Sequence, residues 1–450
     1  MSESDGISPV VVPAKATRAG EALSGRMSGR KSWVEPLIWT ERMLAALDKG
    51  VKGGKWYSLM DKVYPEAVLR AAFLEVAANK GASGVDHVTI ERFADDLDAS
   101  LKRLSEDLRT GSYRPQAIRR HYIPKPGSQE MRPLGIPTVR DRVVQTALRM
   151  VLEPIFEHEF AEQSYGFRPG RGCKDALRRV DTLLRSGYGH VVDADLKSYF
   201  DTIPKDRLLA QIGEKVSDGR ILALVESFLG QSVLDGVREW TPETGTPQGA
   251  VISPLLSNLY LDPLDHLMAA RGFKMVRYAD DFVVVCCSPE EAAEALDLVQ
   301  QWTAQAGLLL HPTKTRLIDA TKDDFEFLGY RFARGRRWPR KKSLTKFKDT
   351  IRAKTRRTNG HSMAKIIADI NKTVRGWFEY YKHSYRTTFP SLDGWIRRRL
   401  RSILRKRSKR DGISPGNGAD QRRWPNAFFG EQGLLSMEEA FAQACRSSRR

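Results

Sequence analysis

The sequence predicts an α+β fold in which a small antiparallel sheet bearing carboxylates precedes a basic helical domain. Two apolar stretches with strand character, 273–277 and 282–287, flank the adjacent acids Asp280 and Asp281. A strand, a tight turn and a second strand would hold both acids at the tip of a hairpin. Residues 331–410 instead carry apolar side chains every three or four positions, which is the spacing of helices that bury one face.

The composition divides the chain into five segments. A chain of 450 residues can bury several cores, so we expect more than one domain. Residues 1–32 are rich in Ser, Gly, Pro and Ala, which favours a disordered N-terminal tail. An N-terminal extension with a basic loop and helices is expected over 33–189, the sheet over 190–330 and the helical domain over 331–410. A Gly/Pro/Asn-rich linker and a short C-terminal helix complete the chain over 411–450.

Several helices can be predicted in chain order. Helical periodicity predicts an amphipathic helix over 90–108, a helix that opens near 203–206, and a last helix over 436–444. A further helix is expected from about Pro289 to Ala306. Ser288 is a suitable N-cap for it, Glu291 would complete a capping box, and Gly307 is placed to end it.

Residues 190–196 are predicted to form a strand whose two faces differ. Alternation puts Asp193 and Asp195 on one face and apolar side chains on the other. Acids on an apolar strand are costly unless they are solvated or bind a cation. One strand acid and the hairpin pair would form a three-carboxylate site suited to two divalent ions roughly 3.5–4 Å apart. Asp193 rivals Asp195 as the strand ligand, and an acidic surface turn is the alternative for the hairpin pair.

The charge of the chain favours a polyanionic partner. Lys and Arg number 74 against 55 acids, a formal net charge of +19. The excess is concentrated in residues 331–410, which hold 27 Lys and Arg against four acids, interleaved with aromatic residues. Basic side chains neutralise phosphates, and aromatic rings either pack the core or stack on bases.

Other composition features argue against a membrane protein or a secreted one. No run of 18 apolar residues is present, and the first 32 residues lack the pattern of a signal peptide. The four cysteines have no spacing that fits a zinc site, and they are expected to be reduced packing residues. We therefore expect a cytoplasmic protein without a membrane partner.

Ordered motifs identify a family resemblance. Residues 195–200 and 278–281 resemble the two catalytic motifs of reverse transcriptases. Further matching blocks occur in the family's order at 123–126, 132–137, 141–145, 164–171, 245–249, 253–258 and 327–330. Together with Arg375-Gly376-Trp377-Phe378-Glu379-Tyr380-Tyr381, they make residues 65–440 resemble the bacterial group II intron-encoded reverse transcriptases, or maturases. No zinc framework follows residue 410, so the endonuclease-lacking type is the better match.

The resemblance implies a right-hand polymerase, with fingers, a palm that carries the YADD hairpin, and an α-helical thumb or maturase-specific domain. It implies two Mg²⁺ ions, with Mn²⁺ able to substitute. Their ligands would be Asp195, the backbone carbonyl of Leu196, Asp280 and Asp281. The spacing to Phe200 favours Asp195 over Asp193 as the strand ligand.

The resemblance also assigns residues to the nucleotide and the primer. The nucleotide-binding set would be Lys125, Arg132, Phe200, Gln248 and Lys314. Lys125 and Arg132 would hold the triphosphate, Phe200 would exclude a 2′-hydroxyl, and Lys314 would protonate pyrophosphate. Plain core packing is the alternative for Phe200, and a solvated surface lysine is the alternative for Lys314. Phe327, Leu328 and Gly329 would form the primer grip.

The implied function is an RNA-directed DNA polymerase that extends a DNA primer on an RNA template with dNTPs. Intron RNA would bind as well, for splicing and mobility, and nucleic acid would contact Arg375, Arg397, Arg398 and Arg399. Two alternatives stay open: a related reverse transcriptase recruited to DNA repair or phage defence, and an RNA-binding maturase with vestigial polymerase activity. The sequence leaves open whether the protein is a monomer or a homodimer.

Overall fold

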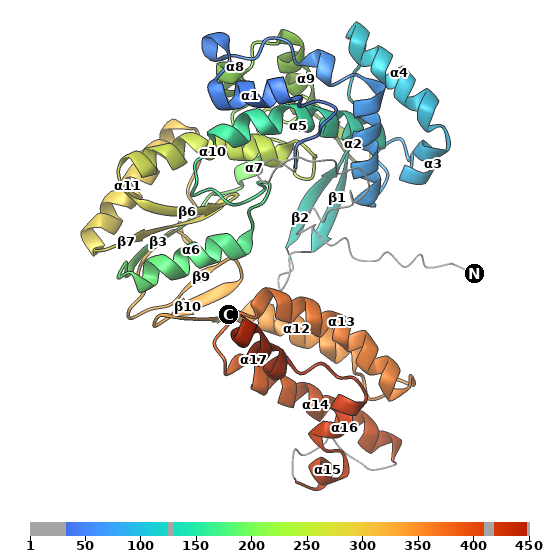
Figure 1. Ribbon diagram of the computed structural model, residues 1–450, viewed down its shortest axis with the longest axis vertical. Helices are drawn as coiled ribbons and strands as arrows, with labels where there is room; N and C mark the ends of the chain where they lie inside the picture. Colours follow the sequence, from blue (N-terminus) through green and yellow to red (C-terminus); the bar gives the residue numbers. More distant parts are fainter. Residues whose placement is uncertain (1–32, 125–129, 409–417, 448–450) are drawn as a thin grey trace.

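The computed structural model describes residues 33–124, 130–408 and 418–447. Figure 1 shows helices and a hairpin from the N-terminal half at the top, a sheet flanked by helices at the left, and a helical domain below. The expected tail over 1–32 and the predicted phosphate-binding Lys125 lie outside the described residues.

The N-terminal half is mainly helical. Its helices are α1 (Glu41–Lys49), α2 (Glu66–Ala78), α3 (Ile90–Asp95), α4 (Leu97–Thr110) and α5 (Val139–Glu159), with short 3₁₀ turns at Lys52–Gly54 and Met60–Lys62. The single helix expected over 90–108 is interrupted at Asp96, whose backbone (φ −125°, ψ 43°) is not helical. Helix α2 packs along α5, which is buried along most of its length.

A hairpin and two short strands form a four-stranded sheet. Its strands are β1 (Ile118–Pro124), β2 (Met131–Ile136), β4 (Val233–Asp235) and β5 (Arg238–Trp240), in the order β2-β1-β4-β5. The hairpin register pairs Ile123 with Arg132. Arg132 therefore lies at the end of the hairpin where the described part of β1 stops, at Pro124.

The central sheet is antiparallel, as the sequence predicts. Its strands are β3 (His190–Asp195), β6 (Lys274–Tyr278), β7 (Asp281–Cys286) and β8 (Arg316–Asp319), in the order β6-β7-β3-β8. The helices of this region are α6 (Cys173–Arg185), α7 (Tyr199–Thr202), α8 (Lys205–Lys215), α9 (Gly219–Leu229), α10 (Ser253–Ala270) and α11 (Pro289–Gln305). The register places Asp195 directly opposite Asp281.

The two faces of this sheet pack into different cores. Val192 and Ala194 face the large core shared with α10 and α11. Val191 faces a second core, which includes α6, so β3 alternates as expected and Asp193 and Asp195 lie on the α6 side.

Helix α11 has the predicted ends with one difference. Ser288 Oγ accepts from the amide of Glu291 at 3.2 Å, and Gly307 (φ 70°) follows the helix. The Glu291 carboxylate, however, accepts from the amide of Cys287 at 2.6 Å rather than from that of Ser288. The reciprocal bond of the predicted box is thus displaced by one residue.

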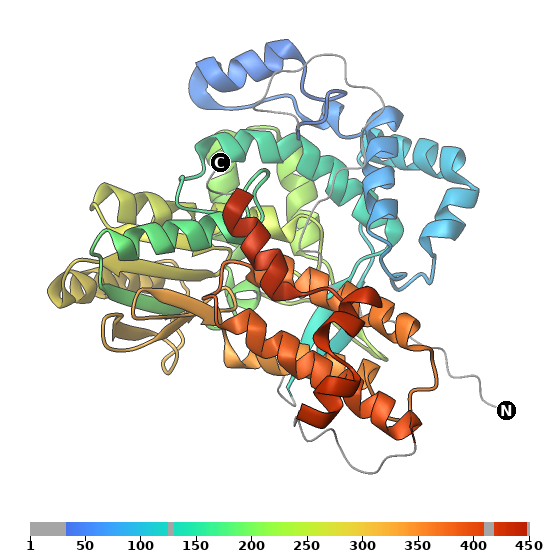
Figure 2. The same cartoon turned by 60° about the horizontal axis from the view of Figure 1, so that its bottom comes forward.

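A small sheet and a helical domain follow. The sheet, in the order β11-β10-β9, consists of β9 (Phe325–Phe327), β10 (Tyr330–Ala333) and β11 (Arg336–Pro339). The helices are α12 (Lys341–Lys354), α13 (Met363–Tyr381), α14 (Thr388–Arg407), α15 (Gly418–Arg423), α16 (Asn426–Glu431) and α17 (Met437–Ser447). In Figure 2 the last helices, in dark red, lie along the other helices of this domain.

The C-terminal segment contains more structure than the one helix expected. Trp424, Phe429 and Met437 are buried in the same core as the apolar stripe of α13. The part of 411–450 that the structure describes therefore belongs to the helical domain. Within the described ranges, none of the helices has the length and apolar character needed to cross a membrane.

Candidate active site

Three carboxylates come together at the edge of the central sheet. Asp195 ends β3 and faces Asp281 at the start of β7. Asp280 occupies the two-residue turn that joins β6 to β7, since Tyr278 pairs with Asp281 across that turn. All three side chains are half-buried. The structure thus brings together the three acids that the sequence singles out.

The hairpin acids are costly to ionise in this position. Burial raises the pKa of Asp281 to about 7, and the negative charges of Asp280, Asp193 and Asp195 add to the effect. Burial also raises the pKa of Asp280. A divalent cation would offset this repulsion, so the chemistry of the donor set fits a metal ion.

The carboxylates do not by themselves enclose an ion. Across residues 33–124, 130–408 and 418–447, no group of three His, Cys, Asp or Glu side chains is placed to hold a metal. Asp195 Oδ2 instead accepts a hydrogen bond from Lys314 Nζ at 2.6 Å. Mg²⁺ usually keeps waters and takes ligands from substrate phosphates, so a site completed by the nucleotide need not be preformed. The metal assignment stays a prediction.

The rival acid Asp193 has a different partner. Arg316 Nη2 donates to Asp193 Oδ2 at 3.0 Å from the neighbouring strand β8. Asp193 also lies opposite Val283, further along the strand from the hairpin tip than Asp195. These contacts favour Asp195 as the strand ligand.

Leu196 continues from β3 into an isolated antiparallel bridge with Leu310. The hydrogen bonds of that bridge are made by its neighbours: His311 N donates to the Asp195 carbonyl at 2.7 Å, and Lys197 N donates to the Leu309 carbonyl at 2.8 Å. The side chain of Leu196 is buried. Its carbonyl stays a predicted ligand.

Arg132, Gln248 and Asp201 form a chain beside the carboxylates. Arg132 Nε donates to Gln248 Oε1 at 3.3 Å, and Gln248 Nε2 donates to Asp201 Oδ2 at 3.1 Å. The positive charge of Arg132 also lowers the pKa of Asp280, against the larger effect of burial. A cavity of about 270 Å³ lies against this chain and is lined by Arg120, Asp201, Trp240 and Gln248 among others. Asp201 was not singled out by the sequence.

The loop that carries Gln248 is docked closely on both sides. A side chain at Gly245 (φ 90°) would put its Cβ 2.6 Å from the Phe200 carbonyl. At Gly249 (φ 104°) a Cβ would lie 2.5 Å from the carbonyl of Gly135 in β2. The absence of a side chain at Gly249 therefore allows the loop to approach the hairpin closely. The ring of Phe200 is half-buried and meets Tyr199 edge-on at 5.5 Å between ring centroids.

The predicted primer grip is a tight turn clamped to the helical domain. Phe327 is buried, while Leu328 and Gly329 both have positive φ angles, 46° and 81°. Tyr380 of α13 donates its hydroxyl to the Leu328 carbonyl at 2.7 Å. The turn thus joins the small sheet to α13.

The four predicted nucleic-acid arginines do not form one surface. Arg375 is exposed on α13. Arg397 and Arg398 of α14 line a cavity of about 450 Å³ together with Lys348, Trp395 and Arg401. Arg399 is used within the fold instead: its Nε donates to Thr355 Oγ1 at 2.7 Å and its Nη2 donates to the Thr355 carbonyl at 3.0 Å.

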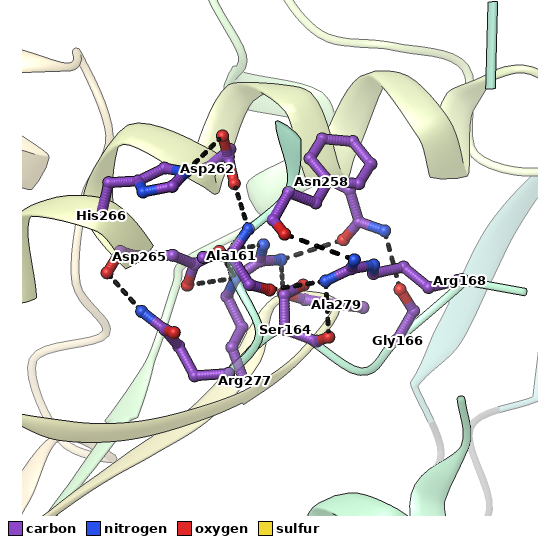
Figure 3. Close-up of polar contacts among 12 residues, drawn as sticks. Ala161, Ser164, Gly166, Arg168, Asn258, Asp262, Asp265, His266, Arg277 and Ala279 are labelled. Atoms are coloured by element: carbon purple, nitrogen blue, oxygen red, sulfur yellow. Dashed lines mark hydrogen bonds and ion pairs between the residues drawn. The ribbon is translucent and has the colours of Figure 1, made fainter. Parts of the chain in front are cut away.

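A buried network behind the hairpin holds residues that the sequence analysis missed. Arg277, next to the YADD motif, pairs with Asp265 of α10, and neither side chain is exposed. Figure 3 shows this pair meeting Asn258 and the loop that carries Gly166 and Arg168. The available signal was an arginine inside an apolar strand, since buried charges are normally paired.

Two family models match the chain. One, described as "Reverse transcriptase (RNA-dependent DNA polymerase)", covers residues 123–332. The other, described as "Group II intron, maturase-specific domain", covers residues 344–424. The first range contains Asp195, Asp280 and Asp281, and the second contains α13 and α14.

Similar curated proteins point the same way. Group II intron-encoded protein LtrA of Lactococcus lactis subsp. cremoris is 38% identical over 208 residues, which is 46% of this chain and 34% of that protein. Protein YkfC of Escherichia coli (strain K12) is 33% identical over 313 residues, which is 60% of this chain and 81% of that protein. The chain thus matches about a third of the length of LtrA but most of YkfC.

Among solved structures, a chain of a partial Cas6-RT-Cas1–Cas2 complex overlaps with 55% of this chain and 41% of its own length, at 25% identity. The TM-score is 0.36, which is too low to support an argument about overall arrangement.

Proposed function

We propose, because this chain belongs to the family of group II intron-encoded reverse transcriptases and maturases, that it is an RNA-directed DNA polymerase acting on a DNA primer and an RNA template. The observation that carries the proposal is the pairing of Asp195 with Asp281 across two antiparallel strands, with Asp280 beside them in the turn. Three carboxylates at one edge are the donor set that two-metal phosphoryl transfer requires.

Asp195, Asp280, Asp281 and the Leu196 carbonyl would hold two divalent ions. Two Mg²⁺ ions, or Mn²⁺ in their place, would activate the primer 3′-hydroxyl and stabilise the departing pyrophosphate. Lys314 Nζ donates a hydrogen bond to Asp195 Oδ2. With Asp195 holding a metal, the Lys314 amine would be available to the phosphates and would serve as a general acid for pyrophosphate.

The nucleotide would lie between the carboxylates and the β1–β2 hairpin. Arg132 would bind the triphosphate, assisted by Lys125, since a guanidinium forms paired hydrogen bonds with phosphate oxygens. Gln248 would contact the nucleotide, with its amide oriented by the bond to Asp201. Phe200 would lie under the sugar and exclude a 2′-hydroxyl.

The helical domain would bind intron RNA and thereby assist splicing and mobility. Support comes from the cavity lined by Lys348, Arg397, Arg398 and Arg401, because clustered cations on one surface favour phosphate contacts. The exposed Arg375 of α13 would add a further contact. Recognition of this kind reads the shape and backbone of RNA.

A primer-extension assay tests the polymerase. The purified protein should extend a DNA primer on an RNA template when Mg²⁺ is present. Asp280→Asn should lower the rate by at least about a hundredfold, because an amide is a poor ligand for a divalent ion. RNA affinity should stay near that of the wild type, since basic surfaces rather than the acids contact phosphate.

Asp193→Asn is the matched control, because it removes a neighbouring acid whose partner is Arg316. Extension by Asp280→Asn within about tenfold of the wild type, a barrier change of only ~1.4 kcal/mol, would contradict the three-carboxylate assignment. A wild-type protein that binds RNA but extends no primer would instead favour a maturase with vestigial polymerase activity.

A further inference from the structure

Arg277 makes a buried ion pair at the end of β6, one residue before the YADD tyrosine. Its side chain and that of Asp265 in α10 are both 0% exposed. Arg277 Nε lies 2.9 Å from each oxygen of the Asp265 carboxylate, and Nη2 also donates to this carboxylate. Buried ion pairs often cost as much in desolvation as they gain in attraction. Stability alone is therefore a weak explanation for this arginine.

The remaining nitrogen of the guanidinium reaches the catalytic turn. Arg277 Nη1 donates to the carbonyl of Ala279 at 2.9 Å and to Asn258 Oδ1 at 2.9 Å. Asn258 Nδ2 in turn donates to the Gly166 carbonyl at 2.7 Å. Figure 3 shows how these contacts join three segments: the turn, helix α10 and the loop with Gly166.

The turn needs support because its backbone is strained. Ala279 has φ 59°, a left-handed conformation that costs a non-glycine residue about 1–2 kcal/mol. Gly166 covers the turn closely, since a Cβ at that position would lie 2.2 Å from the amide nitrogen of Ala279. The turn is therefore contacted at the Ala279 amide by the Gly166 loop and at the Ala279 carbonyl by Arg277.

Nearby contacts fix the Gly166 loop itself. The amide of Tyr165 donates to the Arg277 carbonyl at 2.9 Å. Arg168, which pairs with Glu157, donates to the carbonyls of Ala161 at 2.5 Å and Ser164 at 3.0 Å. Arg277 is thus anchored by a buried ion pair with Asp265, and the Gly166 loop by the buried Arg168 guanidinium and its half-buried partner Glu157.

We propose that Arg277 is a positioning residue for the reaction: it holds Ala279 in the left-handed conformation and so aims Asp280 and Asp281 at Asp195. The proposal rests on the proposed polymerase function. Its physical basis is that small misplacements of catalytic groups cost large factors in rate. Arg277 does not touch substrate, and its effect passes through the turn.

Arg277→Lys is the first test variant. An ammonium keeps the charge opposite Asp265 but lacks the planar fork, so it cannot bind Asp265, Asn258 and the Ala279 carbonyl together. We expect kcat to fall by about 10- to 100-fold while KM for dNTP stays near the wild-type value. Amide hydrogen exchange in the peptide that covers 278–282, measured without substrate, should become faster.

Ala279→Gly in the Arg277→Lys background tests whether kcat falls because the turn is no longer held in its left-handed conformation. Glycine adopts positive φ without penalty, so the turn should need less support and kcat should recover by about threefold or more. His87→Gly in the same background is the matched control, because His87 also has a left-handed backbone (φ 55°) but lies outside this network. It should recover nothing.

Asn258→Ala is a second test variant, which keeps the proposal testable if Arg277→Lys does not fold. It leaves the pair of Arg277 with Asp265 in place and removes two hydrogen bonds, the one from Arg277 Nη1 to Asn258 Oδ1 and the one from Asn258 Nδ2 to the Gly166 carbonyl. It should show the same signature, with a smaller fall in kcat and faster exchange in 278–282.

Two results would overturn the proposal. One is a folded Arg277→Lys protein whose kcat is within about twofold of the wild type. The other is a fall in kcat that Ala279→Gly does not reverse and that is fully explained by a smaller fraction of folded protein. If the wild-type protein extends no primer, the polymerase function fails instead, and hydrogen exchange still decides whether Arg277 orders the turn.

Discussion

Asp281 combines two conditions that oppose ionisation, burial and nearby negative charge. Together they raise its pKa to about 7, whereas an Asp in an unfolded chain titrates near pH 3.9. The folded protein therefore binds a proton at Asp281 that the unfolded chain has already lost between these pH values. Stability of the metal-free protein should consequently fall as pH rises from about 4 to about 7.

Asp281→Asn should stabilise the metal-free protein at high pH. The amide cannot ionise, so at pH 8 in EDTA the variant avoids the repulsion that the wild type experiences. Its melting temperature should be higher, by roughly 1 °C for each kcal/mol of repulsion relieved, and the difference should shrink toward pH 5. Thermal unfolding at both pH values measures this difference. Asp297→Asn, at an exposed position of α11, is the control. A difference independent of pH would contradict the argument.

Phe200→Ala should change the choice of sugar. If the ring lies under the bound nucleotide, its loss opens space for a 2′-hydroxyl and lowers the ratio of kcat/KM for dATP over that for ATP. The half-buried ring beside Tyr199 is also compatible with plain packing. In that case both kcat/KM values would fall together, and stability would drop by about 3–5 kcal/mol. Measuring both substrates on one primer–template separates the two roles.

The sequence predicts the three carboxylates but not their supports. A two-residue turn predicts Asp280 and Asp281, and strand alternation narrows the third acid to Asp193 or Asp195, of which the spacing to Phe200 in the family motif favours Asp195. Some of the contacts that support the site join residues far apart in the sequence. Asn258 reaches Gly166 across 92 positions, and Lys314 reaches Asp195 across 119. Pairings of that kind depend on tertiary structure, for which a single sequence carries no periodic signal.

At the scale of the elements, Arg399 joins α14 to the end of α12, so this basic residue stabilises the fold. Arg399 of α14 donates to Thr355 Oγ1 and to the Thr355 carbonyl, at the C-terminal end of α12, and its guanidinium lies 5.6 Å from the Trp395 ring centroid. The last carbonyls of a helix have no hydrogen-bond partner within the helix. A cation at that end can donate to them and interacts favourably with the negative end of the helix dipole.

Arg399→Ala should therefore destabilise the protein more than Arg398→Ala. Loss of charged hydrogen bonds to a half-buried helix end should cost about 1–3 kcal/mol in the free energy of unfolding. Arg398 is exposed, and its replacement should cost less than about 0.5 kcal/mol. Denaturant unfolding of both variants tests this. Equal stabilities would mean that the Thr355 contacts contribute nothing measurable.

Element boundaries were harder to predict than element types. The helix pattern over 90–108 is continuous in sequence, yet Asp96 breaks it into α3 and α4. Over 411–450 the sequence predicts only a linker and one short helix, but Trp424 and Phe429 are buried against α13 and α14. Short helices such as α15 and α16 are too brief to form alone and depend on that shared core.

At the scale of the whole molecule, basic side chains lie both in the N-terminal half and in the helical domain, on either side of the central sheet in the sequence. Figure 1 shows the N-terminal half, the central sheet and the helical domain as three regions. Arg120 and Arg132 belong to the β1–β2 hairpin, and Arg397 and Arg398 to α14. A net charge of +19 gives long-range attraction for nucleic acid, but only residues in contact with phosphate release counterions.

RNA binding should weaken steeply with salt, and the slope should locate the contacts. Each lost phosphate contact flattens the log–log slope by about 0.7–0.9. The double variant Arg397→Ala, Arg398→Ala should flatten it without loss of stability, because Arg399 and its helix contacts are kept.

Arg178→Ala with Arg185→Ala removes the same formal charge from α6, where both arginines pair with Asp residues, and should leave the slope unchanged. Titrations of structured RNA at several salt concentrations measure all three proteins. Equal slopes for the two double variants would show that net charge alone is responsible, whereas an unchanged slope for the α14 variant would move the main RNA contact to the N-terminal half.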